Sequence, residues 1–343
     1  MNRTMIVSFG TLLVLMLCAC SGEQQPEQTV PSYSANTIAD IQEWQVPWED
    51  SRPRDPYVAP DGDVWFVGQR GDYIAEFNPD NQQFRRIDLP EGAGPHNCIV
   101  DDEGFIWYAG NRAAHIGRVN PENGEIEQIP MPDDQARDPH TLVFDRNGDI
   151  WFTVQGGNFV GKLTVADRSV ELIEVPTERA RPYGIVVDED NRPWIALFGT
   201  NKLATVDPET MELTEISLER EDARPRRIEW TSDGRVWYAD YAQGYLGAYN
   251  PADQSFSEWV MPDSADANPY AMVSDDQDNL WMVETGVEPN IFLGFHPESG
   301  VFHSQEPIES GGGTVRHMFY HQPTNSIWFG TDTNYLGQTT LEQ

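Results

Sequence analysis

The sequence has few positive charges. Its 343 residues include 22 lysines and arginines against 56 aspartates and glutamates, which gives a formal net charge of −34. Only Lys162 and Lys202 are lysines. Binding to nucleic acid needs clustered basic side chains, so this composition argues against a nucleic-acid partner and against attraction to an anionic membrane surface. The content of 39% hydrophobic and 11% aromatic residues still permits a packed core, so the acidic chain is not globally disordered.

Long apolar segments are also scarce. The run from Met5 to Met16 is too short to cross a bilayer as a stable helix and is followed by Leu17-Cys18-Ala19-Cys20. We therefore predict a signal peptide over residues 1–20. Its end resembles a bacterial lipobox, which would make Cys20 the lipidated first residue of the mature chain; the alternative is ordinary cleavage nearby without a lipid.

The segment after the signal peptide is rich in Gln, Glu, Pro and Ser, and we predict that residues 21–37 form a flexible tether. The expected product is an exported periplasmic or cell-surface lipoprotein, in the outer rather than the inner membrane, that touches the membrane only through its lipid. Lipidation would leave Cys98 without a partner, so no disulfide framework is expected. No Cys-x-x-Cys-His motif for covalent haem is present.

A repeat fills the rest of the sequence. Seven tryptophans recur at intervals of 42 to 47 residues, at positions 65, 107, 151, 194, 237, 281 and 328. Each unit combines a proline-led strand, a turn, the tryptophan strand, an aliphatic residue followed in most units by glycine, a further turn and a last strand. This period predicts an all-β fold, a seven-bladed β-propeller with four antiparallel strands per blade over residues 38–343.

The two ends of the repeat predict how the ring closes. The seventh unit stops at its third strand, Leu336 to Leu341, whereas Ile41 to Pro47 precedes the first unit and matches the pattern of a fourth strand. We therefore expect the N-terminal strand to complete the last blade, which leaves no open sheet edge.

One polar residue per unit is placed to face the central channel. It follows the opening proline, or follows Arg316 in the seventh unit, where the proline is missing. The set is Arg54, His96, His140, Tyr183, Arg226, Tyr270 and His317. Such side chains either fill the channel and bond one another, or bind a polar or anionic ligand together. Three carboxylates, Asp240, Glu284 and Asp332, come three or four residues after a tryptophan and extend the candidate site. Their oxygens are suited to a hard divalent ion.

The repeated pattern Pro-His/Tyr-x-Ile, Asp-Gly-x-Ile-Trp-Phe, Ile-Gly and Pro-x-x-Gly resembles the streptogramin B lyase (virginiamycin B lyase) family of seven-bladed propellers. The resemblance extends over residues 40–343 and includes the segments 137–141, 181–188, 198–202 and 223–228. It implies a Mg²⁺-dependent elimination that opens an ester-linked cyclic peptide: a histidine removes an α-proton and the ester carbon–oxygen bond breaks.

The resemblance also implies roles for particular residues. His317 stands at the position of the catalytic base, and Asp332 stands at one metal position. The other metal position holds Val315 instead of glutamate, and Tyr270 replaces a substrate-binding histidine. Glu284 and Asp240 are the candidate replacement ligands.

Two functions therefore stay open. The first is a lyase with His317 as base and Asp332, Glu284 and Asp240 on magnesium. The second is a non-catalytic, monomeric propeller whose channel face binds a small polar or anionic ligand or a protein partner. A cluster of arginines in an acidic chain favours the second: Arg54, Arg181, Arg224, Arg226 and Arg227. A serine hydrolase is unsupported because no Gly-x-Ser-x-Gly motif is present.

Overall fold

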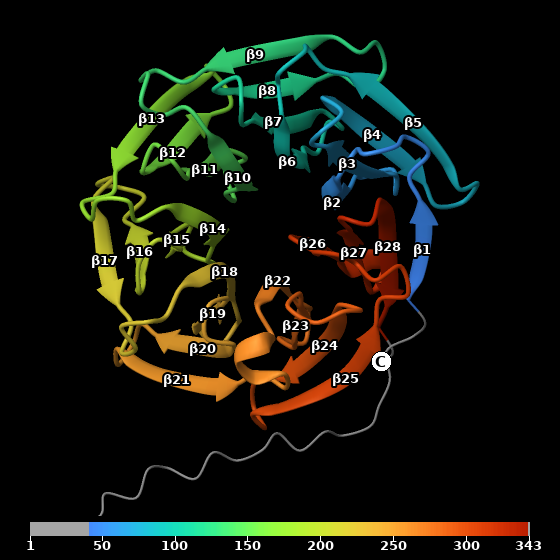
Figure 1. The fold of residues 1–343 in the computed structure, drawn as a ribbon. Helices are drawn as coiled ribbons and strands as arrows, with labels where there is room; N and C mark the ends of the chain where they lie inside the picture. Colours follow the sequence, from blue (N-terminus) through green and yellow to red (C-terminus); the bar gives the residue numbers. More distant parts are fainter. Residues whose placement is uncertain (1–40, 342–343) are drawn as a thin grey trace, which may run out of the picture. The chain divides into compact units, whose positions relative to one another are not determined.

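The computed structural model describes residues 41–341, and these residues form seven four-stranded antiparallel sheets arranged in a ring (Figure 1). The predicted signal peptide, the tether and the lipidation site at Cys20 lie outside the described residues and stay predictions. Within residues 41–341, no helix is long and apolar enough to span a membrane.

Each sheet is one blade, and its strands follow one another from the ring centre outward (Figure 1). Blade 1 contains β2 (Pro53–Val58), β3 (Val64–Gly68), β4 (Tyr73–Asn78) and β5 (Gln83–Asp88). Blade 2 contains β6 (Pro95–Val100), β7 (Ile106–Gly110), β8 (His115–Val119) and β9 (Ile126–Pro130). Blade 3 contains β10 (Pro139–Phe144), β11 (Ile150–Val154), β12 (Phe159–Thr164) and β13 (Ser169–Glu174). Blade 4 contains β14 (Pro182–Val187), β15 (Pro193–Leu197), β16 (Lys202–Val206) and β17 (Leu213–Ser217).

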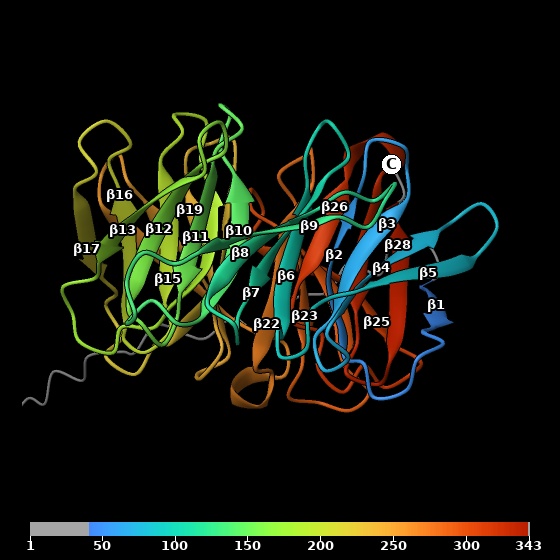
Figure 2. The ribbon, with the colours of Figure 1, turned by 90° about the horizontal axis from the view of Figure 1, so that it is seen from above.

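The remaining blades complete the ring. Blade 5 contains β18 (Pro225–Trp230), β19 (Val236–Asp240), β20 (Tyr245–Asn250) and β21 (Ser255–Val260). Blade 6 contains β22 (Pro269–Ser274), β23 (Leu280–Glu284), β24 (Ile291–His296) and β25 (Val301–Pro307), with the short 3₁₀ helix η1 (Ser264–Asp266) before it. Blade 7 contains β26 (Met318–His321), η2 (Gln322–Thr324), β27 (Ser326–Gly330) and β28 (Tyr335–Thr340). Figure 2 shows that the strands run between the two faces of the ring.

The N-terminal strand closes the ring as the sequence predicts. Strand β1 (Gln42–Gln45) pairs antiparallel with β28, with Gln42 opposite Gln338 and Gln45 opposite Tyr335. Blade 7 therefore combines strands from both ends of the repeat, and its outer edge is β1, the first strand within residues 41–341.

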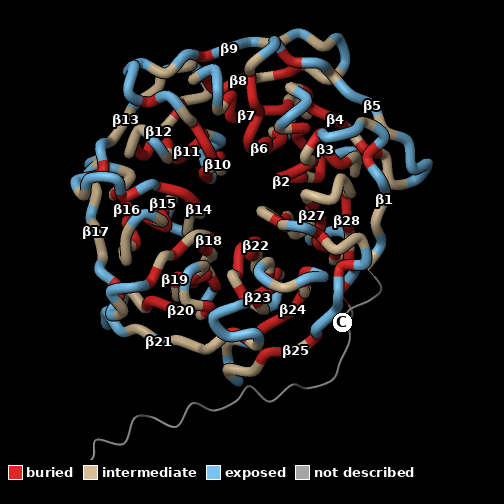
Figure 3. Tube along the Cα trace, viewed as in Figure 1, coloured by how far each residue is buried: buried red, intermediate tan, exposed pale blue. Residues whose placement is uncertain are grey.

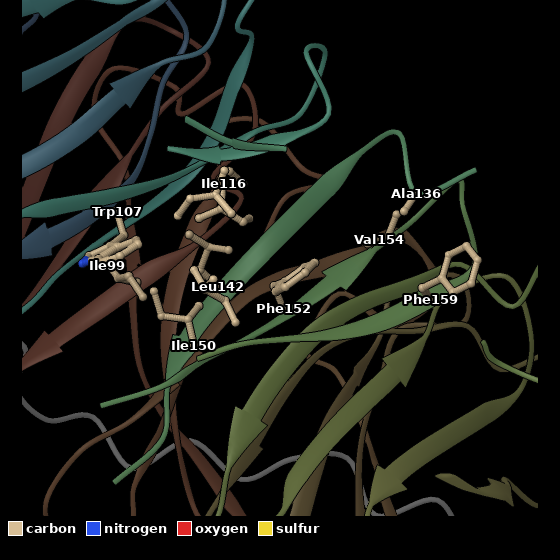
Figure 4. Packing of buried hydrophobic residues seen from close by; sticks show 12 residues of the cluster. Ile99, Trp107, Ile116, Ala136, Leu142, Ile150, Phe152, Val154 and Phe159 are labelled. Carbon is tan, nitrogen blue, oxygen red and sulfur yellow. The ribbon is translucent and has the colours of Figure 1, made fainter. Parts of the chain in front are cut away.

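The core lies between neighbouring blades (Figure 4). Trp107 of blade 2 is fully buried in one cluster with Ile150 and Phe152 of blade 3. Its indole N–H donates to the Asp101 carboxylate at 2.9 Å, which satisfies the polar atom of an otherwise apolar side chain. The inner strands are largely buried, whereas the outer strands alternate with exposed residues (Figure 3).

The recurring glycine of the third strand makes room for an aromatic ring on the second strand. Gly161 lies opposite Phe152, and a Cβ atom on this glycine would approach the Phe152 ring to 2.2 Å. Gly247 and Tyr238 repeat this relationship in blade 5 at 2.0 Å. The motif is therefore a packing requirement.

A β-bulge interrupts the inner strand of blades 1 to 6 close to its opening proline. In blade 3, for example, Pro139 and Leu142 are three residues apart, but their partners Val154 and Phe152 on β11 are only two apart. Bulges change the direction in which side chains point and are frequent beside functional sites. Here the extra residue lies at or next to the polar position that the sequence predicts for the ring centre.

Candidate functional site

The seven polar residues that follow the opening prolines form the ring set at the centre of the propeller: Arg54, His96, His140, Tyr183, Arg226, Tyr270 and His317. All except Arg226 and His317 are buried, with exposed fractions between 0% and 6%. Arg226 and His317 are partly exposed. The ring centre is thus filled by polar side chains, two of which reach solvent.

Ring contacts connect consecutive blades. The ring centroids of His96 and His140 lie 3.6 Å apart, and those of His140 and Tyr183 lie 4.1 Å apart. The hydroxyl groups of Tyr183 and Tyr270 also form a hydrogen bond. This bond connects blades 4 and 6, which are separated in the ring by blade 5. The structure therefore brings four of the predicted ring residues, His96, His140, Tyr183 and Tyr270, into direct contact.

Arg226 lies among aromatic rings. Its guanidinium carbon is 3.7 Å from the ring centroid of Tyr270, 4.3 Å from Tyr241, 4.6 Å from Phe198 and 5.0 Å from Tyr183. These distances are within the range of cation–π attraction. Among the described residues, no carboxylate forms an ion pair with Arg226, so aromatic faces and the Tyr183 hydroxyl are its neighbours.

A hydrogen-bond network lies beside the ring set and centres on Asp55. The Asp55 carboxylate accepts hydrogen bonds from Arg54 Nε at 2.9 Å and from the Asn97 amide at 3.1 Å, and Arg227 Nη2 lies 3.7 Å away. Burial alone would raise the pKa of Asp55, but Arg54, followed by His317 and Arg227, outweighs it and holds this pKa well below its usual range.

Arg227 extends the same network to two further blades. Its Nε donates to the backbone carbonyl oxygen of Arg316 at 3.0 Å, and its Nη1 donates to the Thr141 hydroxyl at 3.3 Å. Thr141 also bonds the His140 ring at 2.8 Å. Sequence reasoning on the ring set missed Asn97 and Thr141. Their position in the repeat could have identified them, because Asn97 and Thr141, like Asp55 and Arg227, are the second residue after an opening proline.

The ring histidines are held neutral. Burial and then the positive charge of Arg227 lower the pKa of His317 to about 3, although Asp55 partly opposes the shift. Burial and Arg54 lower the pKa values of His96 and His140 well below the usual value. At neutral pH each imidazole can accept a proton or a hydrogen bond through one ring nitrogen.

The predicted metal ligands do not form one site. Asp332 accepts two hydrogen bonds from Arg316, at 3.1 and 2.5 Å, and also faces Arg52 at 3.5 Å. Asp240 is bound by Arg220 at 2.5 Å and by the backbone N–H of Arg224 at 2.9 Å.

Glu284 belongs to a different environment. Its Oε1 accepts the backbone N–H of Asp263 at 3.1 Å, and burial raises the pKa of Glu284 to about 8. A carboxyl group that stays protonated at neutral pH is a poor ligand for a cation.

These residues do not fit a magnesium ion. Within residues 41–341, no group of three His, Cys, Asp or Glu side chains is placed to hold a metal. Val315, at the other metal position implied by the resemblance, is fully buried and offers no oxygen from its side chain. Asp332, Glu284 and Asp240 thus do not form one group in residues 41–341: Arg316 neutralises Asp332, Arg220 pairs with Asp240, and Glu284 accepts the backbone N–H of Asp263.

Several buried polar atoms of the ring centre have no hydrogen-bond partner among the described residues. They are Arg54 Nη2, His96 Nδ1, Arg226 Nε, Arg227 Nη2 and His317 Nδ1. Arg54, Arg226, Arg227 and Arg316 bring four positive charges, against the two negative charges of Asp55 and Asp332. The ring centre is thus positively charged and rich in unused donors, inside a protein whose formal net charge is −34.

A cavity of the described residues lies away from the ring centre. A cavity of about 620 Å³ is lined by turn residues of blades 2 and 3 and by Tyr57, and none of the ring residues contributes to it. Its lining contains five acidic residues, Asp102 among them, and three arginines, Arg146 among them, so its formal charge is negative.

Fold and site together define a seven-bladed propeller with a positively charged polar centre. A sequence model of the virginiamycin B lyase family matches residues 34–206, half of the chain. The protein therefore belongs to the virginiamycin B lyase family. No relative was found among proteins of curated function.

Solved structures show the same fold. Virginiamycin B lyase from Staphylococcus aureus superposes with a TM-score of 0.80 at 23% identity, over 88% of this chain and 99% of that chain. A catalytically inactive histidine-to-alanine variant of that enzyme, solved with quinupristin, gives the same values. The extracellular domain of a putative one-component system from B. thetaiotaomicron has a TM-score of 0.67 at 14% identity, over 87% of this chain and 39% of that chain.

Proposed function

We propose that the protein binds a small anion, in particular a single carboxylate group, at the ring centre. The observation that supports this most is the pair Arg54 Nη2 and Arg227 Nη2. Both donors are buried and have no hydrogen-bond partner among residues 41–341, although Arg227 Nη2 forms an ion pair with Asp55 at 3.7 Å. Both side chains reach the same Asp55 carboxylate. Buried donors without partners are costly, and a carboxylate accepts two N–H groups from guanidinium side chains well.

Charge and size support the same class of ligand. The positive ring centre in an acidic chain focuses a negative ligand toward one place. Buried side chains fill this centre, which favours a ligand as small as one carboxylate group over a large molecule. Partly exposed Arg226 and His317 provide the contact with solvent through which the ligand approaches.

Calorimetry and thermal unfolding with succinate test the proposal, with the neutral isostere succinamide as the control ligand. At 100 times its Kd, succinate should stabilise the fold by about 2.7 kcal/mol, and succinamide should have no effect. Arg226→Met keeps much of the side-chain volume and should weaken succinate binding at least about tenfold. Arg146→Met, at an exposed position, should not weaken it. Equal binding of succinamide, or equal loss in both variants, would overturn the proposal.

A second candidate is an elimination lyase, supported by His317. This histidine stands at the base position implied by the family, its Nδ1 has no partner, and its low pKa keeps it neutral. Neutral imidazole would take the α-proton of a depsipeptide, the carbon–hydrogen electron pair would form a double bond, and the ester oxygen would leave as a carboxylate. Since the residues do not fit magnesium, the nearby guanidinium groups would stabilise the charge on the carbonyl oxygen.

Quinupristin is the substrate for testing this candidate. Elimination opens the ring without changing the mass, whereas hydrolysis adds the mass of a water molecule, so chromatography with mass spectrometry distinguishes the two. We expect a ring-opened isomer that disappears in His317→Gln. No isomer with the wild-type protein, or the same rate in His317→Gln, would exclude His317-dependent lyase activity and leave the carboxylate-binding proposal in place.

A further inference from the structure

The hydroxyl groups of Tyr183 and Tyr270 meet directly, although they come from blades 4 and 6. Both side chains are buried, with exposed fractions of 3% and 0%. A tyrosine hydroxyl can donate one hydrogen and accept others, so two hydroxyls in contact can share a proton between them. Neither tyrosine is needed in this arrangement for packing alone, because phenylalanine has the same ring.

The charged groups that face this pair are guanidinium groups. Arg226 Nη2 lies 3.5 Å from the Tyr183 hydroxyl, and the Arg226 guanidinium carbon lies 3.7 Å from the Tyr270 ring centroid. The Arg227 guanidinium carbon lies 5.4 Å from the Tyr183 ring and 5.9 Å from the Tyr270 ring.

The other neighbours are of two kinds. Arg316 lies 5.8 Å from the Tyr270 ring, and Arg54 adds a further positive charge. The neutral rings are His140, 4.1 Å from Tyr183, and Tyr241, 5.7 Å from Tyr270. Asp55 lies behind Arg54 and is already bound to it. The surroundings therefore favour a negative charge on the tyrosine pair.

We propose that Tyr183 and Tyr270 act as one proton-exchanging unit, which gives up a single proton and holds the resulting negative charge between the two hydroxyls against Arg226. The proton leaves the pair to solvent or to a bound base, and no other bond changes. This charge also attracts Arg227 and Arg54, the guanidinium groups proposed to hold a carboxylate. Protonation of the tyrosine pair is thus coupled to anion binding at the ring centre. This coupling rests on the proposed function.

The direction of the coupling follows from the electrostatics. Burial alone would raise the pKa of Tyr183, but Arg226, Arg227 and Arg54 outweigh it and lower this pKa to about 8. Burial and the charge on Tyr183 raise the pKa of Tyr270 to about 12, so only one of the two ionises near neutral pH. When a carboxylate binds, the pair takes a proton back. Anion affinity should therefore fall about tenfold for each pH unit above the first ionisation.

The ionisation itself can be tested without any ligand. Ultraviolet difference absorbance follows tyrosinate formation during a pH titration of the whole protein. In the wild type, one tyrosinate should form with a midpoint about two pH units below the usual tyrosine pKa, which is near 10. Tyr183→Phe should remove this early step, and Tyr270→Phe should move it to higher pH, because the donor that stabilises the tyrosinate is lost.

Tyr108→Phe is the matched control, because Tyr108 is also fully buried and bonds a histidine, His115, instead of a tyrosine. It should leave the early step unchanged. Absence of an early step in the wild type, or its persistence in Tyr183→Phe, would overturn the proposal that the two tyrosines exchange a proton as one unit. An unchanged step in Tyr270→Phe would show two independent tyrosines and would also overturn it.

Proton linkage then tests the coupling. Calorimetry with succinate at pH 8 in two buffers of different ionisation enthalpy should show proton uptake by the wild type and none by Tyr183→Phe. Succinate binding without proton uptake would overturn the coupling. An early tyrosinate with no succinate binding at any pH would instead overturn the proposed carboxylate site while the proton-exchanging unit stands.

Discussion

Arg227 Nε donates a hydrogen bond to the backbone carbonyl oxygen of Arg316 at 3.0 Å, and this bond ties blade 5 to blade 7 at the ring centre. The same guanidinium reaches the Thr141 hydroxyl of blade 3 and lies 3.7 Å from Asp55 of blade 1. One side chain therefore connects four blades. Because Asp55 is the acceptor that balances the charge of Arg227 and Arg54, it is the place at which to test the network.

Asp55→Asn should destabilise the protein by about 3–5 kcal/mol, because it leaves buried guanidinium groups without their negative partner. Urea unfolding measures the change. Asp50→Asn is the control: Asp50 pairs with Arg70 at the exposed surface, and its loss should cost less than about 1 kcal/mol. Similar losses in the two variants would contradict a stabilising network around Asp55.

The ring histidines should make stability depend on pH. Free imidazole titrates near pH 6.5, whereas the pKa of His317 in the fold is lowered to about 3. Below about pH 6.5 the unfolded chain therefore binds a proton that the folded chain does not, and stability falls as the pH decreases toward 3. Glu284, with its raised pKa, contributes the opposite slope, so the prediction concerns a difference between variants.

His317→Gln should reduce the slope of unfolding free energy against pH by about one proton between pH 6 and pH 4. Urea unfolding at a series of pH values measures this slope. His296→Gln, at an exposed position, should leave the slope unchanged. A slope in His317→Gln equal to that of the wild type would show that His317 is not held neutral.

Gly161→Ala should destabilise the protein by about 1–3 kcal/mol, because the new methyl group would overlap the Phe152 ring. A double-mutant cycle provides the control. Phe152→Leu removes the ring, so the double variant should lose less stability than the sum of the two single changes. Additive losses would mean that the glycine is required for another reason.

Magnesium should not stabilise this protein. Arg316 and Arg52 neutralise Asp332, and Val315 offers no side-chain ligand. The melting temperature should therefore be the same in millimolar Mg²⁺ and in excess EDTA, as thermal unfolding at constant ionic strength would show. A rise of several degrees in Mg²⁺ alone would contradict this, since a ligand bound to the folded state raises its stability.

The fold could be predicted because each blade repeats the same local chemistry. Tryptophans at a period near 43 residues, with the same order of turns and strands around each, predict the same four-stranded sheet seven times. The ring set followed from the same repeat, since one position after each opening proline faces the centre. Even the closing strand β1 was visible as a fourth-strand pattern at the opposite end of the chain.

The contacts inside the ring could not be predicted in the same way. They depend on how far side chains extend across the centre and on the β-bulges that set the direction of those side chains. A local sequence pattern predicts neither. The hydrogen bond between Tyr183 and Tyr270, for example, connects blades 4 and 6, which are not neighbours in the ring. The surroundings of the predicted metal ligands are a further example: the sequence places a carboxylate at Asp332, but only the structure shows that Arg316 pairs with it.

A crystal structure of the protein soaked in succinate tests the central claim most directly. The account predicts density for a carboxylate group at the ring centre, about 2.7–2.9 Å from Arg54 Nη2 and Arg227 Nη2. At saturating succinate, density only at surface arginines, or none at the ring centre, would contradict the assignment of this propeller as a carboxylate-binding protein.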